Sequence, residues 1–236
     1  MSQHTFQTEV SQLLHLIIHS LYSQKEIFLR ELISNSSDAL DKFRYLTLTN
    51  DEFKSFDFDP KVHLEYVDGE NPTLTISDCG IGMSKKELQD NLGTIARSGT
   101  KNFLSKLSGD SKQDSNLIGE FGVGFYSCFM VADKVHVSSK KAGNKQAWKW
   151  ISDGNSGYEI SKDVRKDAGT SITLYLNDEG KEFANRWKIE NLVKKYSDHI
   201  DFPIFLTFDN IEYDKEGKEK SRNSKTEQIN DAKAFW

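Results

Sequence analysis

The fold of this chain can be argued outward from one stretch, Glu31-Leu32-Ile33-Ser34-Asn35-Ser36-Ser37-Asp38-Ala39-Leu40-Asp41-Lys42. It lies within residues 25–46, whose apolar side chains recur at helical spacing and therefore predict an amphipathic helix. At about 100° per residue, four polar side chains form one stripe along the border of the apolar arc: Glu31, Asn35, Asp38 and Lys42. Such a stripe is either a solvated flank with two i,i+4 pairs or the mouth of a cleft, and the stretch alone leaves both open.

The composition indicates a soluble globular protein of one large or two small domains. The chain has 236 residues, of which 36% are hydrophobic and 28% are charged. Its 31 Lys and Arg against 36 Asp and Glu give a net charge of −5, which argues against non-specific binding to nucleic acid. Cys79 and Cys128 are the only cysteines, so neither a disulfide framework nor a zinc site is expected and a reducing compartment is favoured. No basic leader and no run as long as a membrane span is found, so the cytoplasm is the predicted location.

The order of the predicted elements indicates a two-layer α+β domain with a mostly antiparallel sheet covered by helices. The predicted helices span residues 10–21, 25–46, 85–91, 101–107, 125–131 and 182–199. The predicted strands span residues 62–67, 73–78, 134–139, 146–151, 158–160, 170–176 and 204–208, with a further strand or arm at 6–10. Because these elements do not alternate in a βαβα order, a Rossmann fold is disfavoured.

Two local features add to this prediction of elements. Ser84 is a predicted helix N-cap, and Glu87 three residues later completes a capping box. Residues 212–231 are highly charged and poor in apolar side chains, so they are expected to form a surface hairpin or a linker. The chain then stops at an aromatic pair, which suggests a longer protein cut at a domain edge.

A buried carboxylate is predicted at the end of the second strand. Alternation places Asp78 on the same inward face as Leu74 and Ile76. An inward carboxylate is costly unless a donor satisfies it, and the exocyclic amino group of adenine is a suitable donor. In Asp78-x-Gly80-x-Gly82, the last glycine would let a purine approach the backbone. The alternative is a strand-terminal aspartate that caps the following turn.

A second glycine-rich segment, Gly119-x-x-Gly122-x-Gly124, leads directly into a predicted helix. Backbone N–H groups at that helix start could receive phosphates. The spacing differs from both the dinucleotide-binding fingerprint and the P-loop, and a glycine-rich turn can be purely structural. The Asn35 carboxamide suits Mg²⁺, and Glu31 one turn away could orient or deprotonate a water that attacks a γ-phosphate.

Taken in order, Glu31-x-x-x-Asn35, Asp78-x-Gly80-x-Gly82 and the segment 119–124 resemble the Bergerat ATP-binding fold of the GHKL superfamily. That superfamily includes gyrase, the ninety-kilodalton heat-shock chaperones, histidine kinases and MutL. The sequences at 22–35, 92–100 and 121–127 are similar to the chaperone branch, and the similarity runs from about residue 6 to residue 236. The short N-terminus and the lack of a long acidic linker resemble bacterial members.

The resemblance implies the N-terminal ATP-binding domain of an ATP-dependent chaperone, with ATP or ADP and Mg²⁺ as cofactors. This domain would span residues 1–212, and the charged segment 213–236 would lead to a middle domain outside this sequence. ATP binding would close a homodimer of the full-length protein and hydrolysis would reset it. The implied partners are client proteins, with no nucleic acid and no membrane, and the isolated domain is expected to be monomeric.

The resemblance also assigns roles to individual residues. Glu31 is the implied general base, and Asn35 would ligand Mg²⁺ and contact phosphate. Asp78 would hold the adenine amino group, with Gly82 and Thr170 joining through ordered water. The remaining implied nucleotide contacts are Asp38, Lys42, Met83, Asn91, Leu92, Arg97, Gly119, Gly122, Val123, Gly124 and Phe125.

In the family, a lid closes over the nucleotide, here residues 93–100 and 119–124, and the segment 6–10 exchanges between protomers. Two residues depart from the family pattern. Arg97 stands where lysine is usual, so the charge is kept but the compact ammonium is not. Glu120 stands where glutamine is usual and adds a negative charge beside the phosphates. The family completes its site with an arginine from the next domain, so this chain is expected to bind nucleotide well and turn it over slowly.

Two other functions stay open from the sequence. An ATPase of the MutL or gyrase kind would show DNA-stimulated hydrolysis, against which the acidic charge balance argues. A pure interaction module with a vestigial pocket would fail to bind adenine nucleotides.

Overall fold

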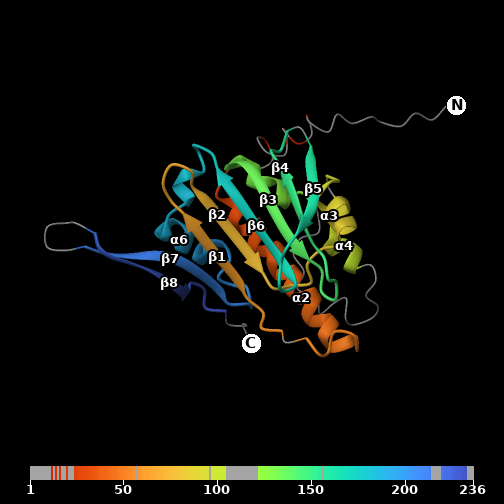
Figure 1. Ribbon diagram of the computed structural model, residues 1–236. Helices are drawn as coiled ribbons and strands as arrows, with labels where there is room; N and C mark the ends of the chain where they lie inside the picture. Colours follow the sequence, from red (N-terminus) through yellow and green to blue (C-terminus); the bar gives the residue numbers. More distant parts are fainter. Residues whose placement is uncertain are drawn as a thin grey trace.

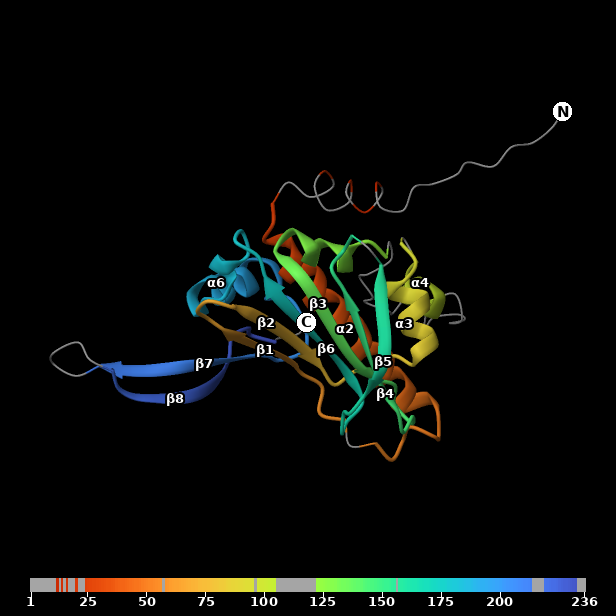
Figure 2. The same cartoon turned by 45° about the horizontal axis from the view of Figure 1, so that its top comes forward.

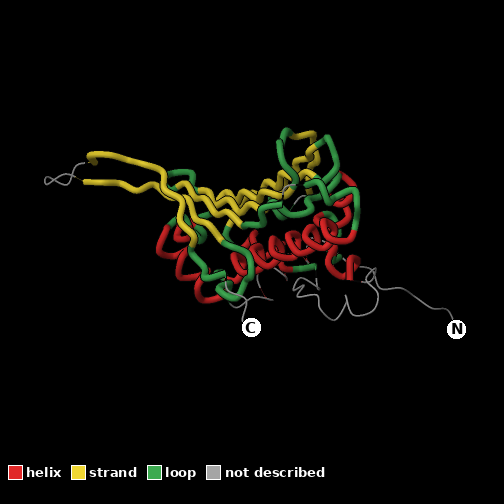
Figure 3. Tube along the Cα trace, turned by 90° about the horizontal axis from the view of Figure 1, so that it is seen from below, coloured by secondary structure: helices red, strands yellow, loops and turns green. Residues whose placement is uncertain are grey.

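A single eight-stranded sheet forms one layer of the molecule, and helices cover one of its faces (Figure 1, Figure 3). The computed structural model describes residues 12, 14, 16, 20, 24–56, 58–95, 97–104, 122–155, 157–213 and 219–232. The strand order is β5-β4-β3-β6-β2-β1-β7-β8. Neighbouring strands are antiparallel except β1 and β7, which are parallel. The predicted two-layer α+β fold with a mixed, mostly antiparallel sheet is confirmed.

The predicted strands between residues 62 and 208 are all present, with ends that move by a few residues. The strands are β1 Val62–Val67, β2 Thr73–Asp78, β3 Ala132–Lys140, β4 Ala147–Ser152, β5 Tyr158–Asp163, β6 Gly169–Leu176, β7 Ile204–Tyr213 and β8 Glu219–Gln228. The helices are α2 Ile27–Thr49, α3 Lys85–Leu92, α4 Gly99–Leu104 and α6 Arg186–Tyr196, with 3-10 helices η2 Gly124–Met130 and η3 Lys181–Phe183. The capping box at the start of α3 is confirmed, because Ser84 accepts from the backbone of Glu87, whose side chain accepts from the backbone of Ser84.

The helix α2 runs beneath the sheet and carries the centre of the core (Figure 2). The centre of its apolar arc is fully buried, as Phe28, Leu32 and Leu40 show. The helix contacts β2, which ends just before Gly80 and Gly82, and η2, which begins at Gly124, so it lies beside both glycine motifs. Burial of the apolar arc therefore fixes the rotation of α2 and turns its polar stripe towards these motifs.

The strand β2 alternates as the sequence predicts. Leu74 and Ile76 are buried against the helices, whereas Thr75 and Ser77 on the other face are half-buried. Asp78 continues the buried row. The strand pairs with β6 in the register Asp78↔Thr170, so these two predicted site residues are neighbours across the sheet.

The prediction of one helix over residues 182–199 is wrong. The chain forms the short η3 and then α6, and the break falls at Ala184 and Asn185. Asn185 has an extended backbone, and its side chain accepts from the backbone N–H of Lys188, so it caps a new helix and cannot continue the old one. The predicted helix 125–131 is confirmed as a buried element but is the 3-10 helix η2.

The strand β7 continues past residue 208 and turns back into β8, so the predicted strand 204–208 is not the last one. The β7–β8 hairpin projects from the body of the molecule (Figure 1, Figure 2). This confirms the hairpin expected for the charged segment. The predicted domain boundary after residue 212 falls at the end of β7 and stays a prediction.

Some predictions fall on residues outside the described part of the chain. These are the arm at 6–10, most of the helix at 10–21, the last turn of the helix at 101–107, and the glycine motif before residue 122.

Candidate functional site

Asp78 lies at the end of β2, where it is buried between the sheet and α2. Only 7% of the residue is exposed. Its Oδ1 accepts from the backbone N–H of Gly80 at 2.9 Å and from that of Thr170 at 3.3 Å. Both alternatives from the sequence therefore hold for this aspartate. It caps the turn that follows β2, and its carboxylate points inward.

Burial raises the pKa of Asp78 from its ordinary value to about 6. The backbone donor of Gly80, the charge of Arg165, the backbone donor of Thr170 and the hydroxyl of Ser36 all lower that pKa, but the loss of hydration dominates. Near neutral pH the group is an ionised acceptor in a largely dry place. A ligand N–H donor there would gain an unusually strong hydrogen bond.

The two glycines after Asp78 are required by the packing of the protein itself. A Cβ on Gly80 would stand 2.6 Å from the backbone carbon of Ala39, so this glycine lets the end of β2 touch α2. Gly82 has φ +62, and a Cβ there would stand 2.0 Å from the carbonyl oxygen of Lys140. Both substitutions would collide with backbone, which cannot move without shifting the site.

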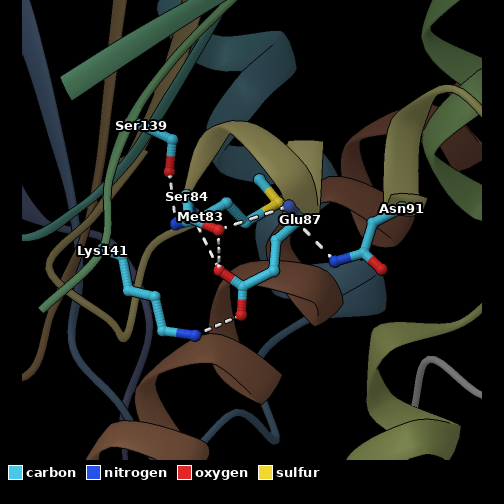
Figure 4. Close-up of polar contacts among 6 residues, drawn as sticks. All are labelled: Met83, Ser84, Glu87, Asn91, Ser139 and Lys141. Carbon is cyan, nitrogen blue, oxygen red and sulfur yellow. Dashed lines mark hydrogen bonds and ion pairs between the residues drawn. The ribbon is translucent and has the colours of Figure 1, made fainter. Parts of the chain in front are cut away.

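Ser139 on β3 links the segment after Asp78 to β6, and no sequence pattern predicted this residue. Its hydroxyl accepts from the backbone N–H of Met83 at 2.8 Å and lies 2.9 Å from the hydroxyl of Thr170. Figure 4 shows this contact beside Asn91, whose amide lies 3.9 Å from the sulfur of Met83. Only a sheet register can bring a strand serine to this place, so no sequence motif marks it.

Glu31 faces the start of η2 from the polar stripe of α2. Its Oε1 accepts two hydrogen bonds from the guanidinium of Arg30, at 2.5 and 3.2 Å. A Cβ on Gly124 would stand 2.3 Å from Oε2 of Glu31, so the glycine leaves room for the carboxylate. The first and third sequence motifs therefore meet in space.

The Asn35 carboxamide is half-buried on the same stripe and makes no hydrogen bond to any residue that the structure describes. A carboxamide oxygen is a ligand type that a hard cation accepts. Among the described residues there is no group of three or more His, Cys, Asp or Glu side chains that could hold a metal ion. The donor set fits Mg²⁺ that is held mainly by phosphate and water with one protein ligand.

Asp38 and Lys42 are linked by a residue from another helix. The ammonium of Lys42 donates to the hydroxyl of Thr100 at 2.6 Å, and that hydroxyl donates to Oδ2 of Asp38 at 2.8 Å. Asp38 is 1% exposed, and burial lowers the pKa of Lys42. Thr100, in the first turn of α4, thus bridges the two residues of the predicted i,i+4 pair. It also belongs to the segment 93–100 that is expected to form part of the lid.

The described part of the third motif lies against the other segment predicted for the lid. Gly122 has φ +67, and a Cβ there would stand 2.5 Å from the backbone of Arg97. Val123 is the N-cap residue of η2. Phe125 is 8% exposed, and its ring packs edge to face on Tyr126 and Trp150.

Among the described residues, the Arg97 side chain does not contact another predicted site residue. It is exposed and pairs with Asp90 of α3 at 3.2 Å. Leu92 is buried, and its carbonyl accepts from the hydroxyl of Tyr126 at 3.1 Å. Gly119 and Glu120 lie outside the described residues.

Comparison with known proteins adds a family and close relatives. Residues 22–165 match the family described as histidine kinase-, DNA gyrase B- and HSP90-like ATPase. The chain is 57% identical over 236 residues to the chaperone protein HtpG of Helicobacter pylori strain HPAG1, which covers 99% of this chain. It is 56% identical to HtpG of Treponema denticola over 100% of the chain and 58% identical to HtpG of Campylobacter jejuni subsp. doylei over 98%. The chain spans 38% of the length of each of these relatives.

No helix in the described ranges is both long and apolar enough to cross a membrane.

Proposed function

This chain belongs to the family of histidine kinase-, DNA gyrase B- and HSP90-like ATPases, and on that premise we propose that it binds adenine nucleotide between α2, the end of β2 and η2. The observation that carries the proposal is the buried Asp78 carboxylate. It is an ionised acceptor with two backbone donors on one oxygen, and it lies beside the helix that carries Glu31 and Asn35. A purine amino group would supply a further donor to it.

We propose that the phosphates lie towards Asn35 and the start of η2. The Asn35 carboxamide oxygen would ligand Mg²⁺, which supplies charge neutralisation for the phosphates. Glu31 would orient an attacking water and accept its proton. Its carboxylate borders Gly124, the last glycine of the third motif, at the start of η2 towards which the phosphates are proposed to lie. Met83, Asn91, Leu92, Val123 and Thr170 would line the ligand, and Gly119, Gly122 and Arg97 would belong to the closing lid.

The activity of the whole protein is also a proposal, since the chain spans 38% of its relatives. The relatives are named chaperones, so we propose that nucleotide binding here drives the remodelling of client proteins in the cytoplasm by a homodimer. On this proposal the nucleotide domain spans residues 1–212, and 213–236 lead towards a further domain. An ATPase that acts on DNA is not favoured, because neither the relatives nor the net charge of −5 points to nucleic acid.

The test is a calorimetric titration of this chain with Mg·ADP, beside the variants Asp78→Asn and Asp209→Asn. The second is a matched acid-to-amide control on β7, where the exposed Asp209 pairs with Arg222. Binding by the wild type and the control that Asp78→Asn abolishes would support the proposal. Lack of binding by the wild type would contradict it and leave an interaction module. Turnover should be slow, and fast hydrolysis by this chain alone would contradict the expected need for an arginine from a further domain.

A further inference from the structure

Arg165 reaches from the connection between β5 and β6 to the end of β2. Its Nη2 donates to the backbone carbonyl of Asp78 at 3.0 Å, and its Nη1 donates to the hydroxyl of Ser171 at 2.6 Å. Its Nε donates to the carbonyl of Asp167 in its own connection at 3.1 Å. Ser171 alternates with the buried Thr170 and Ile172, so the guanidinium lies on the face of the sheet opposite the helices, behind Asp78.

The three acceptors of Arg165 are all neutral. Two are backbone carbonyls and one is a hydroxyl, and no carboxylate among the described residues forms an ion pair with the guanidinium. No ion pair among the described residues therefore neutralises this charge, although the Asp163 carboxylate lies on the same face, where it accepts from the hydroxyl of Ser138, the cross-strand partner of Ser171. Half-burial of the side chain reduces the screening of that charge by water.

We propose that Arg165 is a positioning residue for Asp78, which fixes the peptide that carries the carboxylate and keeps the carboxylate ionised, so that it sets the lower pH limit of adenine binding. This inference rests on the proposed role of Asp78 in holding adenine. It assigns a function to a residue outside the three motifs, on the opposite face of the sheet from the ligand.

The groups that act on Asp78 come from three sides. Ser36 on α2, the backbone N–H of Gly80 and the backbone N–H of Thr170 are neutral donors, and the neighbouring Cys79 thiol has a pKa that burial raises. Arg165 supplies the positive charge among the described groups that act on the carboxylate, and it lowers the pKa of Asp78 against the effect of burial. A neutral side chain at position 165 could not replace that effect.

A purely structural role is the competing explanation, and it makes a different prediction. Arg165 could merely fasten the connection that follows β5. However, the ammonium of Lys140 also holds this connection, through the carbonyl of Lys166 at 2.7 Å. Loss of Arg165 should therefore leave the fold in place. A structural role alone would lower stability without moving the titration of Asp78.

The experiment measures the titration of the Asp78 carboxyl carbon by NMR and the affinity for adenosine, which has no phosphate to titrate, across the same pH range. The variants are Arg165→Gln and Arg165→Met as neutral replacements and Arg165→Lys as the replacement that keeps the charge. Arg222→Gln is the matched control, since Arg222 pairs with Asp209 on the remote β7–β8 hairpin.

Both neutral variants should raise the Asp78 midpoint by about one pH unit, as expected for the loss of a nearby opposite charge. Adenosine binding should then be about threefold weaker at pH about 6.5 and nearly unchanged at pH about 8. The lysine variant should recover at least half of the shift, and the control should not move. Either neutral variant is sufficient if the other does not fold.

A wild-type midpoint in the neutral variants, or a loss of affinity that is equal at every pH, would overturn the inference. So would a lysine variant that titrates like the neutral ones. If the wild type fails to bind adenosine at any pH, the proposed function fails instead, and the carboxyl titration still decides whether Arg165 controls Asp78.

Discussion

Asp78 and Glu31 are the two carboxylates on which the proposed site depends, and their surroundings differ. Asp78 is buried, and backbone N–H groups from the turn after β2 and from β6 hold it. Glu31 has 23% of its side chain exposed, and the side chain of Arg30 holds it. Backbone donors cannot leave without moving the main chain, whereas a side-chain partner can rotate away. We call the surroundings of Asp78 the adenine end of the proposed site and those of Glu31 the hydrolytic end. The adenine end is therefore held rigidly, whereas the carboxylate at the hydrolytic end can exchange partners.

The glycines of the two ends give the largest test of this difference. Gly82→Ala places a methyl group 2.0 Å from a backbone oxygen at φ +62, so we expect a loss of about 3 to 5 kcal/mol of unfolding free energy. Gly124→Ala meets the tip of the Glu31 side chain, which can turn aside, so we expect a loss below about 1.5 kcal/mol together with slower hydrolysis. Urea denaturation of both variants measures this, and equal losses would remove the contrast.

The second test separates binding from hydrolysis. Glu31→Gln should lower the hydrolysis rate by about 10² to 10⁴-fold, because the amide cannot accept a proton from water. The affinity for ADP should change by less than about threefold, since recognition lies at the adenine end. Single-turnover hydrolysis and calorimetry measure the two quantities, with the exposed Glu65→Gln on β1 as control. A parallel loss of binding would show that the ends are not separable.

The third test uses the pH dependence of stability. The folded-state pKa of Asp78, about 6, is higher than its ordinary value of 3.8, so the folded protein holds the proton more tightly than the unfolded chain. The stability that this proton provides is fully present below pH 3.8 and is lost as pH rises through about 6, in total about 3 kcal/mol. Asp78→Asn should lack this slope. Denaturation at acidic and neutral pH checks it, and parallel curves for the two proteins would show that Asp78 is not buried as an acid.

The fourth test concerns α2, the helix that runs between the two ends, and its contact with Thr100 of α4. Thr100→Val removes the hydroxyl between Lys42 and Asp38, and we expect a loss of about 1 to 3 kcal/mol because the buried Asp38 and the half-buried Lys42 lose a partner. Thr75→Val is the matched control, because its hydroxyl pairs with Thr173 on the half-buried outer face of the sheet. A control that costs as much as Thr100→Val would mean that the bridge adds nothing specific.

The smallest expected effect concerns the departure at Glu120. The variant Glu120→Gln removes a negative charge expected near the phosphates and should bind ATP about two- to threefold more tightly. Affinity for adenosine should not change, because the adenine end lies elsewhere. Equal or weaker ATP binding by the variant would refute this.

Local patterns were sufficient for much of the fold and for the principal residues of the site. The alternation of residues in β2 predicted that Asp78 lies on the buried face of the strand. The helical spacing of residues in α2 predicted the polar stripe with Glu31 and Asn35. The capping box predicted the start of α3. Each of these depends on neighbours within a few residues, so the sequence contains the whole cause.

Contacts between distant segments could not be predicted in this way. The break at Asn185, the bridge through Thr100, the link through Ser139 and the reach of Arg165 all depend on which segments meet. The role of Gly82 also changed, because the sequence suggested room for a purine and the structure places the Lys140 carbonyl against it.

The sequence by itself therefore determined the elements, the inward carboxylate and the motifs that identify an ATPase family. Periodicity and short-range hydrogen bonding depend on residues that are close in the sequence. They can therefore be recognised without knowing which distant segment packs against them. Only the tertiary structure decided how firmly each carboxylate is held and which charge lies behind Asp78, because the strand order puts β6 between β3 and β2. That order brings Arg165 and Asp78, which are 87 residues apart, into hydrogen-bond contact.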